Sequence, residues 1–187
     1  MKNTTQRGFT LIETLVAITI LTLAIAGPLT TASRALVSAE ISRDQLTASY
    51  LAQQGLEYVR SVRDNQYLAA YQAGGTAIST VAWTNFLTAV SACQAGTCSY
   101  NPDPNPTSGP LAPCGGATAC PYLYLQNGVY TLNAGSTNVT PFASTIQLTL
   151  TPLVGAVNEE QVVSTVSWNF HGVPYSISAT DHLIPWQ

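Results

Sequence analysis

The sequence predicts an α+β protein in which one long N-terminal helix is followed by a head built on an antiparallel β-sheet. Two observations carry this prediction. Residues 9–71 contain good helix formers with few breakers, whereas the last third of the chain alternates apolar and polar residues with a period of two. Gly74-Gly75 and a segment rich in Pro and Gly separate these two patterns, as expected between structural elements.

The helix should begin with a stretch long enough to cross a membrane. Nineteen residues from Phe9 to Gly27 contain a single charge, Glu13. At about 1.5 Å of rise per residue this length matches the hydrocarbon core of a bilayer. The stretch is apolar all the way round, so lipid or protein should surround it. Lys2 and Arg7 precede it and predict a cytoplasmic N-terminus, with the rest of the chain outside.

Glu13 is the exception within this stretch. A carboxylate inside such a segment costs about 2.5–3.5 kcal/mol on insertion scales, so it should have a partner. The motif Gly8-Phe9-Thr10-Leu11-Ile12-Glu13 resembles the processing site of type IV pilins and type II secretion pseudopilins. The resemblance implies that a prepilin peptidase cuts between Gly8 and Phe9 and methylates the new amine of Phe9. It also implies that Glu13 pairs with the amine of a neighbouring subunit during filament assembly.

Two other interpretations compete with this one. The segment can be a simple membrane anchor, or a secretory signal peptide in which Ala24-Ile25-Ala26 provides a small-x-small cleavage pattern. A signal peptide leaves Glu13 as an unexplained cost. On the pilin interpretation, residues 1–8 are a leader, 9–28 a transmembrane and filament-core helix, and 29–73 an amphipathic spine. Gly27-Pro28 should kink or locally melt the helix, because Pro lacks an N–H for the Ala24 carbonyl.

The spine has an apolar stripe that should face the head. Its members recur three or four residues apart: Leu36, Ile41, Ala48, Leu51, Leu56, Val59 and Val62. The other side carries the charges Arg34, Arg43, Asp44, Glu57, Arg60, Arg63 and Asp64. These charges can form a solvated helix face or contact neighbouring subunits, and the sequence leaves both interpretations open.

Residues 74–121 should hold a short helix near 81–92 and then an irregular segment from Cys93 to Pro121. Four cysteines lie there in the exported part of the chain: Cys93, Cys98, Cys114 and Cys120. An even count outside the cytoplasm favours disulfides, and local pairs are the simplest of three possible connectivities. A structural zinc site is the alternative, although the spacings are wider than the usual C-x2-C.

Residues 122–187 should form the antiparallel sheet of the head. Asn127-Gly128 is a two-residue hairpin signal between short apolar runs. Alternation then predicts strands at 142–150, 161–170 and 175–179. Within 161–170, one face should carry Val162, Ser164, Val166 and Trp168. The ending V-S-T-V-S-W-N-F-H-G-V-P-Y is similar to the terminal hairpin of minor pilins of the PilV or GspI type.

The composition excludes several function classes. Only 8% of residues are charged, and no Lys or Arg follows Arg63, so the head should not bind nucleic acid directly. No nucleophile–base pair accompanies His171 or His182, and no phosphate loop, zinc-protease or dinucleotide motif is found. We therefore expect no catalytic residues, no resident metal and no cofactor.

The pilin resemblance implies a structural subunit, more specifically a minor pilin or pseudopilin. Its implied partners are the prepilin peptidase, sibling pilins, an inner-membrane assembly platform and the membrane itself through the N-terminal helix. It implies a single-pass protein of the inner membrane that later enters an extracellular or periplasmic filament. The alternative is a membrane-tethered surface or ligand-binding protein that does not polymerise.

Overall fold

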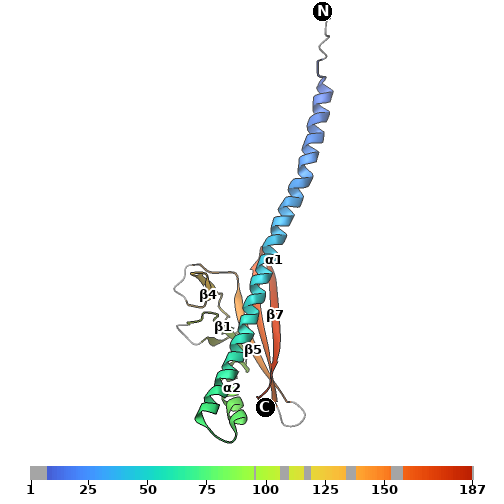
Figure 1. Cartoon of the computed structure of the whole chain (residues 1–187). Helices are drawn as coiled ribbons and strands as arrows, with labels where there is room; N and C mark the ends of the chain where they lie inside the picture. The colour runs from blue at the N-terminus through green and yellow to red at the C-terminus, as the bar shows by residue number, and fades with distance from the viewer. Residues whose placement is uncertain are drawn as a thin grey trace, which may run out of the picture. The chain divides into compact units, whose positions relative to one another are not determined.

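The computed structural model describes residues 8–94, 96–105, 110–115, 119–133, 138–152 and 158–186. Two compact units are distinguished, Met1–Asp44 and Gln45–Gln187. Helix α1, Leu11–Ala73, contributes to both units (Figure 1). Together with an antiparallel sheet packed on the later part of this helix, it forms the α+β, pilin-like architecture predicted from the sequence.

The first unit is the N-terminal part of α1. The helix begins at Leu11, two residues later than predicted. Pro28 lies inside the helix, which continues through Gly27 and Pro28, so the backbone is not locally melted there. The alternative that we expected, a kink at this point, stays a prediction. A proline in a helix interior removes one hydrogen bond and destabilises the helix by about 3 kcal/mol. The intact turns on either side nevertheless keep the backbone helical. Stretching at this point within an assembly stays a prediction.

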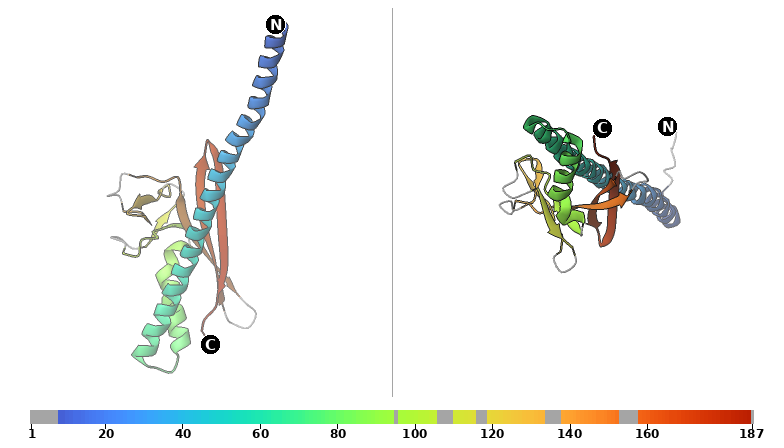
Figure 2. Two further views of the ribbon diagram at one scale, coloured as in Figure 1. Left: turned by 45° about the horizontal axis from the view of Figure 1, so that its top comes forward. Right: turned by 90° about the horizontal axis from the view of Figure 1, so that it is seen from below.

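In the second unit, α1 ends where the backbone reverses. Gly74 and Gly75 have φ angles of 74° and 145°, values that residues with a Cβ rarely adopt. Helix α2 follows at Ile78–Gln94, longer at both ends than the predicted 81–92. It lies beside the last turns of α1 (Figures 1 and 2).

The main sheet has five antiparallel strands in the order β2-β1-β5-β6-β7. Their bounds are β1 Thr97–Tyr100, β2 Leu111–Cys114, β5 Ala143–Pro152, β6 Asn158–Phe170 and β7 Val173–Leu183. The predicted strands at 142–150, 161–170 and 175–179 are confirmed as parts of β5, β6 and β7. The prediction that Cys93 to Pro121 form an irregular segment is wrong, because this part of the chain contains β1 and β2. Pro113 is tolerated in β2 because β2 is an edge strand.

The predicted hairpin at Asn127-Gly128 is confirmed. Both residues have positive φ, 51° and 81°, which is the geometry of a type I′ turn. Its strands, β3 Tyr124–Gln126 and β4 Val129–Thr131, form a separate two-stranded sheet instead of joining the main one. A second turn of this kind, at His171-Gly172, connects β6 to β7.

The core lies between the helices and the inner face of the main sheet. One cluster joins α1, α2 and the sheet through Leu56, Val59, Trp83, Phe86, Val90, Cys98, Ile146, Leu148 and Val162, among others. A second cluster joins Ala48, Leu51, Ala52, Leu123, Phe142, Val166 and Trp168. The predicted stripe is therefore confirmed from Ala48 to Val59, with Val62 half-buried, but Leu36 is 69% exposed in the other unit.

Candidate functional site: the N-terminal processing and assembly segment

The Gly8–Phe9 peptide bond precedes the helix. Gly8, Phe9 and Thr10 have no helical hydrogen-bonding assignment, and all three are exposed, Phe9 by 80%. A Cβ at Gly8 meets no atom within 4 Å, so open space surrounds this position. A protease needs an exposed, non-helical backbone at the bond it cuts, and the structure provides one here.

Thr10 and Glu13 also start the helix. The Thr10 carbonyl accepts from the backbone N–H groups of Glu13 and Thr14 at 3.1 and 3.3 Å, which makes Thr10 the N-cap residue. Glu13 is then the third helical residue, and T-x-x-E is the sequence of a capping box. A carboxylate in the first turn also interacts favourably with the helix dipole. The spacing of Thr10 and Glu13 thus also fits a capping box, a signal that the sequence analysis did not use.

The charge of Glu13 is not compensated within the part of the chain that the structure describes. The side chain is exposed, and none of the ion pairs of the described residues includes it. The helix dipole is worth only about 0.3–1 kcal/mol, which is less than the insertion cost of a carboxylate. A partner from outside the described chain therefore remains necessary if this segment is buried in lipid or in a helix bundle.

The remainder of this segment is apolar and uncovered. The helix includes a window with a mean hydropathy of 2.0, none of it buried within the protein, and it is long and apolar enough to cross a membrane. Its large apolar side chains are exposed, for example Leu11, Ile12, Leu23 and Ile25 by 58–83%. Hydroxyl groups within it donate to helix carbonyls, as Thr14 does to Leu11 and Thr19 to Val16, both at 2.8 Å. The segment is thus suited to an apolar environment.

Comparison with known families supports this interpretation of the N-terminus. Residues 3–27 match the family described as "Prokaryotic N-terminal methylation motif". The match covers residues 3–8 of the predicted leader, the predicted cleavage bond, Glu13 and the apolar helix up to Gly27, and it supports a relationship with type IV pilins and pseudopilins. It also suggests a structural, non-enzymatic protein that is anchored in the inner membrane through the apolar helix. No curated protein and no solved structure gave a significant match.

In the head, the four cysteines form the two local disulfides. Cys93 pairs with Cys98, and Cys114 pairs with Cys120. The first disulfide ties the end of α2 to β1 within the core, where both residues are at most 1% exposed. The structure therefore has disulfides where the alternative interpretation had zinc ligands, and the described residues contain no group of three or more metal-binding side chains.

Two of the charged residues of the spine, Arg60 and Arg63, contact the C-terminal part of the head instead of forming only a solvated helix face. Arg60 Nε donates to Asp181 Oδ2 of β7 at 2.8 Å, and Arg60 also pairs with Glu57. The hydrogen bond from Arg60 lowers the pKa of Asp181, and the same bond raises the pKa of Arg60. Arg63 pairs with Asp64 and lies over the Trp186 ring, 4.7 Å from its centroid. Arg60 and Arg63 thus fasten the C-terminal strand and tail to α1.

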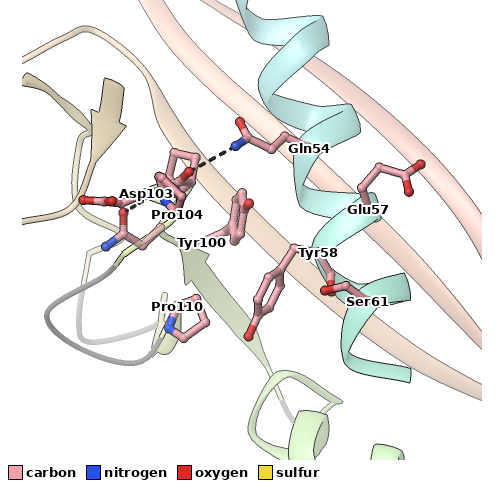
Figure 3. A pocket seen from close by; sticks show the side chains of 10 residues that line it. Gln54, Glu57, Tyr58, Ser61, Tyr100, Asp103, Pro104 and Pro110 are labelled. Atoms are coloured by element: carbon pink, nitrogen blue, oxygen red, sulfur yellow. Dashed lines mark hydrogen bonds between the residues drawn. The ribbon is translucent and has the colours of Figure 1, made fainter. Parts of the chain in front are cut away.

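A groove in the head is the other candidate site (Figure 3). It has a volume of about 360 Å³ and lies between α1 and the loop after β1, with Tyr58, Ser61, Tyr100, Pro104 and Pro110 among its lining residues. The Tyr58 and Tyr100 rings are 5.4 Å apart, and burial raises the pKa of Tyr100 to about 12.

Several polar groups that line this groove are engaged in hydrogen bonds or ion pairs of the fold. The Gln54 amide donates to the Pro102 carbonyl at 3.0 Å (Figure 3), and the Asp103 carboxylate accepts from Thr131 and Asn133 at 3.0 Å each. Glu57 is paired with Arg60. Neither histidine lines the groove, and His171 and His182 are both exposed elsewhere on the head. The groove therefore offers no acid–base pair for catalysis.

Proposed function

We propose that the protein is a structural subunit, a minor pilin or pseudopilin, of a type IV pilus or type II secretion pseudopilus. A prepilin peptidase cleaves it after Gly8 and methylates Phe9. The subunit then leaves the inner membrane through an assembly platform and packs its N-terminal helix among those of sibling subunits. Glu13 pairs there with the terminal amine of a neighbour, and the head is displayed outside the cell or in the periplasm.

The observation that carries this proposal is the combination of the matched motif with an uncovered helix. Residues 3–27 carry the methylation motif, and the apolar side chains of this helix are not buried within the described chain. A bilayer satisfies those side chains before assembly, and a bundle of similar helices satisfies them afterwards. Only the assembled state also supplies an amine for Glu13, which a simple membrane anchor does not.

The processing step is tested by the mass of the exported protein and of its N-terminal fragment. We expect a chain that starts at Phe9 and carries one additional methyl group on its amine. A start at Gly27 would indicate an ordinary signal peptide, and a start at Met1 would indicate a plain anchor. Replacing Gly8 by a bulky residue should leave the leader attached.

The assembly step is tested by variants of Glu13 that separate its charge from its capping role. Gln is accepted in a capping box, so Glu13→Gln keeps the helix start and removes only the charge. We expect Glu13→Gln to be inserted and cleaved normally but to be depleted from sheared filaments. Thr10→Ala is the matched control, because it removes the cap and keeps the charge. Normal incorporation of Glu13→Gln together with loss of Thr10→Ala would show that Glu13 acts as a helix cap instead.

A further inference from the structure

The two edges of the main sheet differ in how well they are protected. The β2 edge is four residues long, contains Pro113 and is tied down by the disulfide of Cys114. The β7 edge is 11 residues long, and no described strand pairs with its outer side. In Figures 1 and 2, β7 is the outermost strand on its side of the sheet. Proteins usually protect a long edge with charges, proline or a bulge.

The register shows which backbone groups of β7 are free. The two-residue turn His171-Gly172 places Phe170 and Val173 opposite each other as a hydrogen-bonded pair. Because bonded and non-bonded pairs alternate in an antiparallel ladder, every second residue from Val173 onward bonds to β6. The residues in between point to the free edge. Ser176, Ser178 and Thr180 present both an N–H and a C=O there. Pro174 presents only its C=O, and the backbone N–H of His182 bonds to the Asp181 carboxylate.

The side chains along this edge lack the usual protection. From Val173 to Thr180 no residue is charged, and the only proline, Pro174, lies at the start of the strand. Asp181 faces the core side and is paired with Arg60, while His182 is paired with Glu159. Ser176, Ser178 and Thr180 are exposed on the outer face. An incoming strand would therefore meet hydroxyl groups and free amides without electrostatic repulsion.

The apolar side chains on the core side of the same edge are only partly covered. Tyr175, Ile177 and Ala179 are half-buried at the rim of the second core cluster, and Tyr175 stacks on Trp168 with ring centroids 5.5 Å apart. One more strand with apolar residues at alternate positions would cover their exposed sides and continue the inner face of the sheet. The outer face of that strand would continue the row of Ser and Thr.

We propose that β7 is a β-addition site that binds an extended, uncharged segment of another polypeptide, with apolar and hydroxyl side chains in alternation. The added strand bonds to the amides of Ser176, Ser178 and Thr180. The statement that a sister subunit supplies this segment rests on the proposed function above. The free edge itself follows from the register and is independent of that function. Such pairing would join heads independently of the N-terminal helices.

The test uses the full-length processed protein in detergent micelles and a peptide with the sequence of residues 161–170 of β6, which contains no charged side chain. This peptide is a suitable probe because β6 is the strand that β7 already pairs with. We expect saturating peptide to slow amide hydrogen exchange at Ser176, Ser178 and Thr180 by about tenfold, in line with about 90% occupancy. A scrambled peptide of the same composition, which lacks the alternation, should have no effect.

Two variants of one residue form the matched pair. Ser178→Pro removes a free-edge N–H without touching the backbone bonds to β6, and Pro174 shows that the strand accepts proline at such a position. Both variants of Ser178 lose its hydroxyl contact with Thr165 of β6, so they differ only in the N–H. Ser178→Ala removes the hydroxyl and keeps the N–H. We expect Ser178→Pro to lose the protection at Ser176 and Thr180, and Ser178→Ala to keep it. Thermal unfolding of each variant checks that the fold is intact, and Ser176→Pro serves if Ser178→Pro is unstable.

The proposal is overturned if the peptide protects none of these amides, or if both Ser178 variants retain full protection. Protection that appears at the Tyr58–Tyr100 groove instead would also overturn it, and would assign peptide binding to that groove. None of these outcomes depends on filament formation. The N-terminal processing and the Glu13 variants therefore test the proposed function separately.

Discussion

Glu160 gives the head an unusual dependence of stability on pH. This residue of β6 is fully buried, and neither carboxylate oxygen has a hydrogen-bond partner of normal geometry among the described residues. Burial raises the pKa of Glu160, and the nearby Gln94 amide offsets only part of the effect. Helix α2, which ends at Gln94, contains no charged side chain that could compensate a carboxylate.

The direction of the effect follows from proton binding. A carboxyl group with a raised pKa in the folded state binds more protons folded than unfolded, so stability falls as pH rises. The contribution is fully present below the unfolded-state pKa of about 4.3 and is lost as pH rises through the folded-state value. Each pH unit in that window changes the free energy of unfolding by about 1.4 kcal/mol.

Glu160→Gln keeps the shape of the side chain and removes its titration. We expect the variant to be more stable than the wild type at neutral pH by about 1–3 kcal/mol, because an amide left without partners still has its own burial cost. Thermal unfolding of the full-length protein in mild detergent, followed by the fluorescence of buried Trp83 and Trp168, measures the difference. The gain should shrink as the pH is lowered toward about 4.

Glu40→Gln is the matched control, because Glu40 is an exposed carboxylate on α1. It should leave the pH profile unchanged. A Glu160→Gln variant that is less stable than the wild type at neutral pH, with an unchanged slope, would refute the reasoning. It would show that the Glu160 carboxylate is ionised and held by donors beyond the described contacts.

Two further predictions concern the packing and cross-linking of the head. Gly55→Ala should destabilise the protein by about 1–3 kcal/mol, because the new Cβ would crowd the Ser164 side chain and lie 3.4 Å from Ile146 Cδ1. Thermal unfolding of Gly55→Ala with and without Ser164→Gly tests this, and the double variant should recover most of the loss. The four cysteines should resist alkylation until the protein is reduced, because both pairs are disulfides; labelling of the unreduced protein, measured by mass, would contradict the pairing.

The period of the sequence predicted most of the regular elements because it reports burial on one face. The alternate residues of β6 that were expected on one face are all buried in the structure: Val162, Ser164, Val166 and Trp168. The stripe on α1 failed at Leu36, since a helix has the same pattern whether or not a head lies beside it. Strands β1 and β2 were missed because they are four residues each, too short for alternation to stand out among Pro and Gly.

The candidate site was predicted from local residues, and apart from the spacing of Thr10 and Glu13 the features that were missed depend on distant ones. Gly8, Phe9 and Glu13 form one short motif, which the family comparison also matches. By contrast, Arg60 and Asp181 are 121 residues apart, and their ion pair is formed only when β7 lies along α1. The free edge of β7 likewise depends on the strand order and on the type of turn, which local composition does not determine.

The distribution of charge leads to a last prediction, that the head does not bind DNA. All basic side chains after the leader lie between Arg34 and Arg63, and no lysine or arginine occurs in the sheet. The structure strengthens this expectation, because Arg60 is held by Asp181 and Glu57 and Arg63 by Asp64 and Trp186. Binding to duplex DNA depends on releasing counterions through several such contacts.

Titration of the processed protein in neutral detergent with duplex DNA at low salt measures this directly, and we expect no binding tighter than about 0.1 mM. Binding that survives the combined replacement of Arg34, Arg43, Arg60 and Arg63 would contradict the charge argument, because no other permanent cationic side chain remains after the leader. Absence of binding at neutral pH would mean that any DNA capture by such a filament must come from a different subunit.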